Sequence, residues 1–372
     1  MKVVIVYDRV NKWGGAERVL LALHEIYPNA PLYTSLYSPV KAGWSKVFTK
    51  VIPSFLNKIP LLSTRHELVP YLMPLAFEAF NFDEYDLVIT VTSEAAKGII
   101  TKPSTIHVCY CQTPTRYLWS HFDEYFDNVW FKIIAKPFVS YLKMWDKIAS
   151  QRPDTMVAIS TEVQNRIKKY YGRKAEVIHS PVDVRKFNKA FEDAKALKKN
   201  QNPYYLIVSR LVPYKKVDIA VKAFNELGKK LIVVGVGNEF KKLKNTAKSN
   251  ITFTGFVTDK ELANLYCGAK CVIHPQEEDF GIVPIEAQAS GVPVIAFGKG
   301  GATDTVIDGT TGVFFDEQTK ESLISAVERF EKMNFNKEVL IKNAERFSKE
   351  RFKKKFSDLV TKLVEIQKSK QF

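Results

Sequence analysis

The chain has 372 residues, of which 46% are hydrophobic and 26% are charged. This balance is typical of a folded globular protein and argues against a disordered, collagen-like or coiled-coil chain. At roughly 150 residues per domain, the length predicts about two domains. The formal net charge is +15, which favours a polyanion, an anionic membrane surface or a phosphate-bearing ligand as partner.

The four cysteines form neither a disulfide framework nor a zinc pattern. Cys109 and Cys111 alternate within an apolar run, and Cys267 and Cys271 lack the spacing of CxxC pairs. We expect buried free thiols in a reducing compartment. The first residues, MKVVIVYDRV, are apolar over too short a stretch for a signal peptide. Because no window offers ~20 uninterrupted apolar residues, we expect no membrane-spanning helix and a cytoplasmic protein.

In the first half of the chain, short apolar runs alternate with helical stretches. The first strand, 3–7, leads through a Gly-Gly turn into the helical pattern AERVLLALHEIY. Further strands are predicted at 86–91, 106–111, 156–160 and 175–180. Continuous apolar strands that alternate with helices are typical of parallel sheets covered on both faces.

The pattern restarts after a polar, Lys-rich stretch between Lys186 and Asn202. Helices begin at Asp218 and Pro284, and strands are predicted at 204–209, 230–235, 250–255, 270–275 and 292–297. We therefore expect an α/β protein with two Rossmann-like parallel-sheet domains, residues 1–190 and 203–347, and a ligand site in the cleft that they face.

The end of the chain, from about Lys337, is one long helical pattern with no strand after it. Apolar residues between positions 348 and 367 form a single stripe of Phe352, Phe356, Leu359, Leu363 and Ile366. Since the strands of the second domain are complete by then, we expect residues 348–372 to return to the first domain.

Ligands of open parallel sheets bind at the carboxyl ends of the strands. Gly14 and Gly15 follow the first strand, where glycines let backbone amides approach an anion at a helix N-terminus. A plain tight turn is the alternative. Neither GxGxxG nor GxxxxGK[ST] occurs, so the loop is no dinucleotide or P-loop fingerprint.

Two cations, Arg210 and Lys215, follow the strand at 204–209. Two cations at one point suit a diphosphate that must leave as an anion, although ordinary surface charge is an equal alternative.

Two carboxylates, Glu278 and Glu286, follow the strand at 270–275. Carboxylates near one helix N-terminus need hydroxyls or cations as partners, and sugar and ribose hydroxyls qualify. The Phe280-Gly281 turn exposes amides for a phosphate. Paired carboxylates also occur in glycosidases, but that reading does not account for the cations and glycine loops.

In combination, the Arg-x4-Lys pair, the Glu-x7-Glu element in EEDFGIVPIEAQASGVPVIA and the segment GGATDTVIDGTTGVFF resemble glycosyltransferase family 4. Members of that family are retaining, nucleotide-sugar-dependent enzymes of the GT-B fold. The resemblance covers nearly the whole chain, including WGGAERV near the start. The segment CYCQTPTRYLWS resembles the branch that includes many mannosyltransferases of bacterial polysaccharide and O-antigen assembly.

The resemblance implies a role for each matching residue. Glu286 would accept hydrogen bonds from the ribose and Glu278 from the donor sugar, while Arg210 and Lys215 would neutralise the diphosphate. Backbone amides would bind the sugar and the phosphates, at Gly14, Gly15, Gly281, Ile282 and Val283. The loop at Phe256 and Val257 would hold the base.

Two positions depart from the family pattern. Gln112 stands where relatives commonly have a histidine near the reacting centre, and glutamine can hydrogen-bond a hydroxyl but cannot take a proton. Asp304 replaces a glutamate. Nearby His107 is better explained as a structural residue. Acceptor contacts are expected from the loop that follows, at Arg116, Tyr117 and His121, with packing of the loop as the alternative for the first two and a structural role as the alternative for His121.

The resemblance implies front-face attack, with the departing phosphate helping to deprotonate the acceptor. Arg210, Lys215, Glu278 and Gln112 would form the catalytic set. No cofactor and no metal are expected, because GT-B enzymes generally need none and no Asp-x-Asp is placed to hold one. The expected donor is GDP-mannose and the expected acceptor a saccharide or lipid-linked saccharide. A UDP-sugar enzyme and a non-catalytic sugar-nucleotide binder remain alternatives; a dinucleotide oxidoreductase and a nucleic-acid-binding protein lack their motifs.

A basic segment, residues 41–66, contains no acidic residue. Its lysines and arginine alternate with large apolar side chains, which is typical of a segment that lies at a membrane interface. We expect peripheral association with an anionic membrane through two short pieces, since Pro53 and Pro60 break any long helix. An ordinary basic loop whose apolar side packs on the domain core is the alternative.

Overall fold

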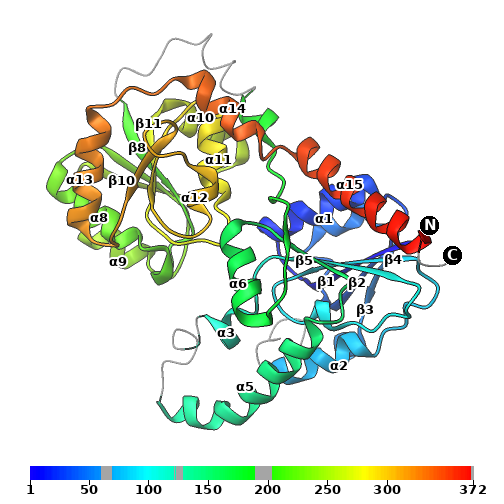
Figure 1. Cartoon of the computed structure of the whole chain (residues 1–372). Coiled ribbons are helices and arrows are strands. Elements are labelled where there is room, and N and C mark those ends of the chain that lie inside the picture. Colours follow the sequence, from blue (N-terminus) through cyan, green and yellow to red (C-terminus); the bar gives the residue numbers. More distant parts are fainter. Residues whose placement is uncertain (60–68, 121, 123–128, 189–202, 370–372) are drawn as a thin grey trace. The chain divides into compact units, whose positions relative to one another are not determined.

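The computed structural model describes residues 1–59, 69–120, 122, 129–188 and 203–369. It divides into two compact units. Unit 1 comprises Met1–Ser180 and Phe352–Phe372, and unit 2 comprises Pro181–Arg351. Figure 1 shows the chain coloured from blue at the N-terminus to red at the C-terminus.

Unit 1 is built on a seven-stranded sheet in the order β3-β2-β1-β4-β5-β6-β7, and all of its neighbouring strands are parallel. Its central strands are buried on both faces, which explains their continuous apolar runs. The strands are β1 (Val3–Val10), β2 (Leu32–Tyr37), β3 (Val51–Pro53), β4 (Leu87–Thr92), β5 (Ile106–Cys111), β6 (Thr155–Ala158) and β7 (Glu176–Val177).

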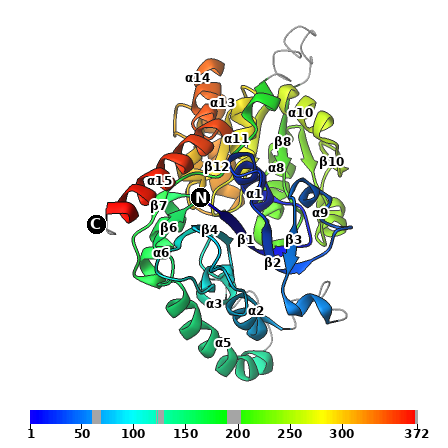
Figure 2. The same cartoon turned by 90° about the vertical axis from the view of Figure 1, so that its right-hand side faces the viewer.

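The α-helices of unit 1 are α1 (Gly15–Ile26), α2 (Met73–Glu78), α3 (Arg116–Trp119), α5 (Val129–Ala149), α6 (Thr161–Tyr171) and α15 (Lys349–Ser369). In α15, Phe352 and Phe356 pack on Tyr110 of β5, with ring centroids 5.7 and 6.5 Å away. Figures 1 and 2 both show α15 beside α1, where Lys353 and Glu25 form an ion pair of 3.0 Å. The last helix of the chain therefore completes the core of unit 1.

Unit 2 is built on a six-stranded parallel sheet in the order β10-β9-β8-β11-β12-β13. Its strands are β8 (Tyr204–Val208), β9 (Leu231–Val234), β10 (Ile251–Gly255), β11 (Ala269–His274), β12 (Val294–Phe297) and β13 (Gly312–Phe315). Its α-helices are α8 (Val217–Leu227), α9 (Phe240–Thr246), α10 (Asp259–Gly268), α11 (Ile282–Ala289), α12 (Ala302–Thr305), α13 (Lys320–Glu331) and α14 (Lys337–Glu345).

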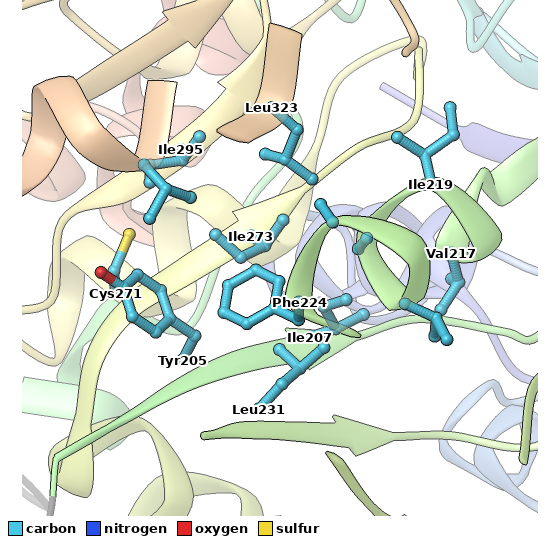
Figure 3. Close-up of a cluster of buried hydrophobic side chains, with 14 of the residues drawn as sticks. Tyr205, Ile207, Val217, Ile219, Phe224, Leu231, Cys271, Ile273, Ile295 and Leu323 are labelled. Carbon is cyan, nitrogen blue, oxygen red and sulfur yellow. The ribbon is translucent and has the colours of Figure 1, made fainter. Parts of the chain in front are cut away.

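The main core of unit 2 lies between this sheet and helices α8 and α13. Phe224 of α8 packs on Tyr205 of β8 at 5.0 Å between ring centroids, and Ile273 and Leu323 belong to the same buried cluster (Figure 3). Phe224 belongs to an apolar stripe with helical spacing, and Tyr205 belongs to an apolar run of the strand. The core holds the carboxyl ends of the strands in fixed positions.

The predicted architecture of two parallel-sheet α/β domains is confirmed. Three strands, β2, β3 and β13, were not predicted. The helical tail from Lys337 consists of two helices rather than one. The helix is interrupted between α14 and α15, where Ser348 forms a parallel β-bridge with Val182. The stripe of α15 buries Val360 with Phe352, Phe356 and Leu359, whereas Ile366 is exposed.

The division between the units falls earlier than the predicted boundary at residue 190. Residues from Pro181 onward belong to unit 2, because Val182 pairs with Ser348 and Phe187 packs on Tyr266 at 5.7 Å. The end of the predicted linker, 189–202, lies outside the described residues. Nothing in the local composition distinguishes these anchoring residues from a linker.

Candidate functional site

The loop after β8 carries both cations predicted for a diphosphate. Arg210 is exposed, and its guanidinium donates a hydrogen bond to the hydroxyl of Tyr214. The Nζ atom of Lys215 lies 5.1 Å from the centroid of the same ring. One aromatic side chain therefore holds both cations at the carboxyl end of β8.

Lys216, which follows, has φ 53° and is the residue with positive φ, other than glycine, in the described part of the chain. It is the N-cap of α8. A lysine in the left-handed region is strained, and such strain is found preferentially at functional sites. No signal in the sequence marks this position.

The Nζ atom of Lys215 forms an ion pair with Glu278 Oε1. Glu278 also accepts a hydrogen bond of 2.9 Å from Gln276 Nε2. Burial alone would raise the pKa of Glu278, but Lys215 and, at acidic pH where its ring is protonated, His274 lower the pKa to about 2. Glu278 is thus a carboxylate at neutral pH. Its ion pair with Lys215 connects the loop after β11 to the loop after β8.

Helix α11 begins directly after this loop and has no side-chain cap. Its N-cap, Gly281, has φ 87°, which favours glycine. The first-turn amides of Ile282 and Val283 have no partner within the helix and are placed to bind an anion. A Cβ at Gly300 would lie 2.5 Å from the Glu278 carbonyl oxygen, so the glycine turn before α12 packs tightly against the Glu278 loop.

Glu286 lies inside α11 and is 3% exposed. Its Oε2 accepts a hydrogen bond of 3.0 Å from the hydroxyl of Tyr266 in α10. The carboxylate predicted to hold a ribose therefore has a protein partner that the sequence did not predict. Phe256 and Val257 follow β10, and Phe256 is 82% exposed, as an aromatic contact for a base would require.

In unit 1, Gly14 is the N-cap of α1, and Gly15 is its first residue, with no side-chain cap. Glu17 is buried below this turn and accepts a hydrogen bond of 2.8 Å from the Tyr7 hydroxyl. Burial raises the pKa of Glu17, against the effect of Tyr7. The turn is therefore anchored from inside by Glu17, whose carboxylate is also stabilised by the backbone amides of Gly14 and of Glu17 itself.

Gln112 follows β5 directly, and its backbone N–H donates to the Thr92 carbonyl at 2.7 Å. Its Nε2 is buried, as is the hydroxyl of Thr113, and neither has a hydrogen-bond partner in the part of the chain that the structure describes. Two unpaired polar groups at the carboxyl end of a buried strand are the arrangement expected where a polar ligand binds.

Close to this strand end, Glu94 forms an ion pair with Arg9 and accepts a hydrogen bond of 3.1 Å from the Tyr117 hydroxyl. Burial raises the pKa of Glu94, and Arg9 opposes this effect. Tyr117 and Arg116 belong to α3 and are half-buried. The third acceptor residue predicted here, His121, lies outside the described residues.

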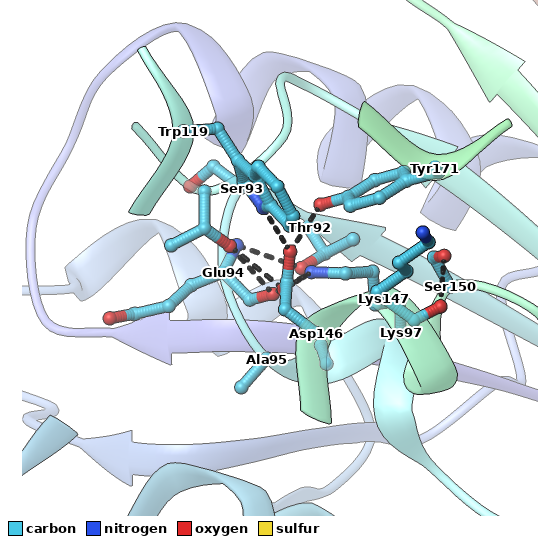
Figure 4. A network of polar contacts seen from close by, with 12 residues as sticks. Thr92, Ser93, Glu94, Ala95, Lys97, Trp119, Asp146, Lys147, Ser150 and Tyr171 are labelled. Atoms are coloured by element: carbon cyan, nitrogen blue, oxygen red, sulfur yellow. Dashed lines mark hydrogen bonds and ion pairs between the residues drawn. The ribbon is translucent and has the colours of Figure 1, made fainter. Parts of the chain in front are cut away.

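A buried network holds α3 and α5 in place behind these groups (Figure 4). The Asp146 carboxylate accepts hydrogen bonds from Thr115 at 3.1 Å, Trp119 at 2.7 Å and Tyr171 at 2.8 Å, and it is ion-paired with Lys97. Asp8, within β1, accepts from the backbone amides of the turn after β4, at 3.0 Å from Ala95 and 2.9 Å from Ala96.

Sequence reasoning missed Arg9, Glu94, Lys97 and Asp146. A usable signal existed only for the first two, which stand two and three residues after the predicted strands 3–7 and 86–91, so that extending the rule that found Gln112 to the whole loop would have included them. His107, in contrast, is buried within β5 with its Nε2 3.0 Å from the Thr90 hydroxyl. This matches its interpretation as a structural residue.

All four cysteines are unpaired, and three are buried, as predicted. In the described ranges, no group of three or more His, Cys, Asp or Glu residues could hold a metal ion. Among the helices that the structure describes, none is both long and apolar enough to cross a membrane.

Comparison with known proteins agrees with this geometry. Residues 188–347 match the family model "Glycosyl transferases group 1". A GDP-mannose-dependent alpha-(1-6)-phosphatidylinositol monomannoside mannosyltransferase of Mycolicibacterium smegmatis is 30% identical over 199 residues, which are 47% of this chain and 52% of the relative. The chain thus spans about half the length of the curated relatives it matches.

Solved structures match over almost the whole chain. Anabaena HepE in complex with UDP has a TM-score of 0.70 at 20% identity, covering 97% of this chain and 100% of that one. The same protein was solved with UDP-glucose, at a TM-score of 0.68 and 19% identity over 97% and 100% of the chains. Sucrose-phosphate synthase of Thermosynechococcus elongatus has a TM-score of 0.71 at 18% identity over 98% and 100%.

The fold is therefore GT-B, with two parallel-sheet α/β units. The match to the group 1 glycosyltransferase model falls on the second of them.

Proposed function

We propose that the protein is a retaining glycosyltransferase that moves a hexose from a nucleotide sugar to a saccharide or lipid-linked saccharide. The observation that carries this proposal is the joining of Lys215 to Glu278 at the uncapped N-terminus of α11. A cation for the diphosphate, a carboxylate for sugar hydroxyls and free amides for phosphate occur at one place.

GDP-mannose is the donor that we propose, supported by the name of the mycobacterial relative. The structural relative solved with UDP-glucose makes a UDP-sugar the second candidate. A panel of GDP- and UDP-sugars in a thermal-shift assay tests both, because a ligand that binds only the native state raises the melting temperature. No shift with any nucleotide sugar would overturn the proposal. A shift without transfer to any acceptor would favour a non-catalytic sugar-nucleotide binder, the role that Gln112 leaves open.

In the proposed reaction, the bond between the anomeric carbon and the diphosphate oxygen breaks, and the acceptor oxygen bonds to the same face of that carbon. The acceptor proton passes to the departing diphosphate. Arg210, Lys215 and the amides of α11 stabilise the negative charge as it develops. Glu278 and Gln112 hold sugar hydroxyls, and no metal or cofactor takes part.

Donor and acceptor would use different groups. Glu286 and the Phe256-Val257 loop would hold the nucleoside, and Gly14 and Gly15 would contribute amides to the phosphate. The acceptor would contact Arg116 and Tyr117 in unit 1, beside the unpaired amide of Gln112. Cell-surface polysaccharide synthesis is the process that we propose for such an acceptor.

A lipid-linked acceptor calls for contact with a membrane, and we propose peripheral binding to the anionic inner face of the cell membrane. Within residues 41–66, Lys46 and Lys50 are exposed, but Phe48 and Leu56 are buried in unit 1. The apolar part of this segment available to lipid is therefore smaller than its sequence suggests.

A second exposed apolar surface lies on α5. Phe138, Tyr141, Met144 and Ile148 are exposed along one face of this helix, and Tyr71 lies 6.2 Å from Phe138 between ring centroids. The helix also carries lysines at 136, 143 and 147, while its Asp146 is buried. Cationic and apolar residues together are suited to an anionic lipid surface.

A further inference from the structure

The imidazole of His274 has no visible structural purpose in the ligand-free protein. It stands at the end of β11 and is 1% exposed. Neither ring nitrogen has a hydrogen-bond partner among the described residues. Unpaired buried polar groups are rare because each one weakens the fold, so a ring with two of them requires an explanation.

The groups around this ring belong to the site. A Cβ at Gly281 would lie 3.7 Å from His274 Nε2, which puts the ring against the start of α11. Glu278 and Lys215 are both near enough to act on the ring by their charges, Glu278 raising the pKa of His274 and Lys215 lowering it. Burial, the largest influence, lowers the pKa of His274 to about 4. The imidazole is therefore neutral at pH 7 and has one N–H to donate.

In the ligand-free protein, Glu278 has two donors, Lys215 and Gln276. A bound diphosphate competes for the ammonium group of Lys215, because two negative charges outweigh one carboxylate. Glu278, half-buried, would then keep the amide of Gln276 as its protein donor, beside the sugar hydroxyls that the proposed function assigns to it. A second protein donor would hold the carboxylate in one orientation toward those hydroxyls.

We propose that His274 is a positioning residue that donates its ring N–H to Glu278 when a nucleoside diphosphate sugar engages Lys215. This inference rests on the proposed function. The unpaired N–H lowers the stability of the ligand-free protein. In the complex it donates to Glu278, stabilises the bound state and keeps the carboxylate directed at the donor sugar.

Two substitutions separate this role from a structural one. His274→Leu removes both unpaired nitrogens, so we expect the ligand-free protein to melt roughly 2–4 °C higher than wild type. The same variant should lose most of the melting-temperature increase caused by the nucleotide sugar, and kcat should fall about 10-fold to 100-fold with a smaller change in KM. His274→Gln restores an N–H and should recover most of both.

The matched control is His107→Leu, which removes a buried histidine from β5 of unit 1 and should leave the ligand-induced shift unchanged. An undiminished shift in His274→Leu overturns the role of His274 alone. A lower melting temperature for ligand-free His274→Leu, without rescue by His274→Gln, marks the residue as structural and also overturns it. A wild-type protein that no nucleotide sugar stabilises overturns the proposed function, and this inference with it.

Discussion

Lys97 Nζ lies 2.5 Å from Asp146 Oδ1, and both side chains are 1% exposed. The ion pair joins the turn after β4 to the end of α5 and thereby positions α3 and its Tyr117. Burial alone would lower the pKa of Lys97, but Asp146 raises it more, so Lys97 stays protonated.

Removing one partner leaves a buried charge unpaired, which typically costs about 3–5 kcal/mol. We therefore expect Lys97→Met to reduce the free energy of unfolding by about that amount in urea denaturation. Replacing both partners, as Lys97→Met with Asp146→Leu, should recover part of the loss. Because Asp146 also accepts from Thr115, Trp119 and Tyr171, recovery should remain incomplete. A single variant as stable as wild type contradicts this account.

Arg210→Ala should lower kcat/KM for transfer by about 10²–10³-fold, equivalent to about 2.7–4 kcal/mol of lost transition-state stabilisation. The guanidinium is exposed, so the fold should be unaffected. Arg329→Ala is the control, because Arg329 is also an exposed arginine of unit 2, paired with Asp308 at 3.4 Å. Steady-state kinetics and a thermal melt of both variants decide the matter, and wild-type turnover by Arg210→Ala would remove this residue from the site.

Glu286→Gln tests the proposed ribose contact without leaving a hole in α11. The amide oxygen can still accept from the Tyr266 hydroxyl, so stability should change little. The weaker acceptor should raise KM for the donor more than it lowers kcat, because the ribose does not react. An unchanged donor KM argues against a ribose contact.

The sequence predicted those parts of the molecule that depend on local pattern. β4 and β5 are buried on both faces and read as continuous apolar runs, so they were found. β2 contains Thr34 and Ser35, whose hydroxyls donate to backbone carbonyls. These polar residues interrupt the apolar run by which a buried strand is predicted. β13 begins at Gly312, where a Cβ would lie 2.1 Å from the Val294 carbonyl oxygen, a requirement visible only in the sheet.

The site divides in the same way. Residues that follow a strand directly, such as Arg210 and Gln112, were predicted because carboxyl ends of parallel strands meet at one edge. Asp146 was missed because it stands within α5, far in sequence from Lys97, and only the packing of that helix brings the charges together. The same reason hid the contact between Tyr266 and Glu286.

Transfer should not depend on a metal ion. The proposed diphosphate already has two cations, Arg210 and Lys215, and the described residues contain no cluster that could hold a metal. We expect the initial rate in excess EDTA to equal the untreated rate. Loss of activity that magnesium or manganese restores would contradict this expectation.

Stability should fall as the solution becomes acidic, partly because of His107. Burial lowers the pKa of this histidine to about 3, with smaller effects from Arg173 and Arg152. Below about pH 6.5, His107 becomes protonated in the unfolded chain but stays neutral in the folded protein. The free energy of unfolding therefore decreases between pH 6.5 and 3. The contribution of one such group is at most about 1.4 kcal/mol per pH unit. Urea denaturation at several pH values should show a shallower slope for His107→Gln, and an unchanged slope would contradict it.

The membrane proposal predicts binding to anionic vesicles at low salt and little binding to neutral ones. Lys46→Glu with Lys50→Glu reverses two exposed charges, each worth roughly 1 kcal/mol near an anionic leaflet, so binding should weaken most at low salt, where screening is least. Met144→Ser with Ile148→Ser removes part of the apolar face of α5, and its effect should persist at high salt, because apolar burial is not screened. Sedimentation with both lipids at two salt concentrations measures these four combinations. Equal partitioning to both lipids, or wild-type binding by both double variants, would contradict peripheral association through these surfaces.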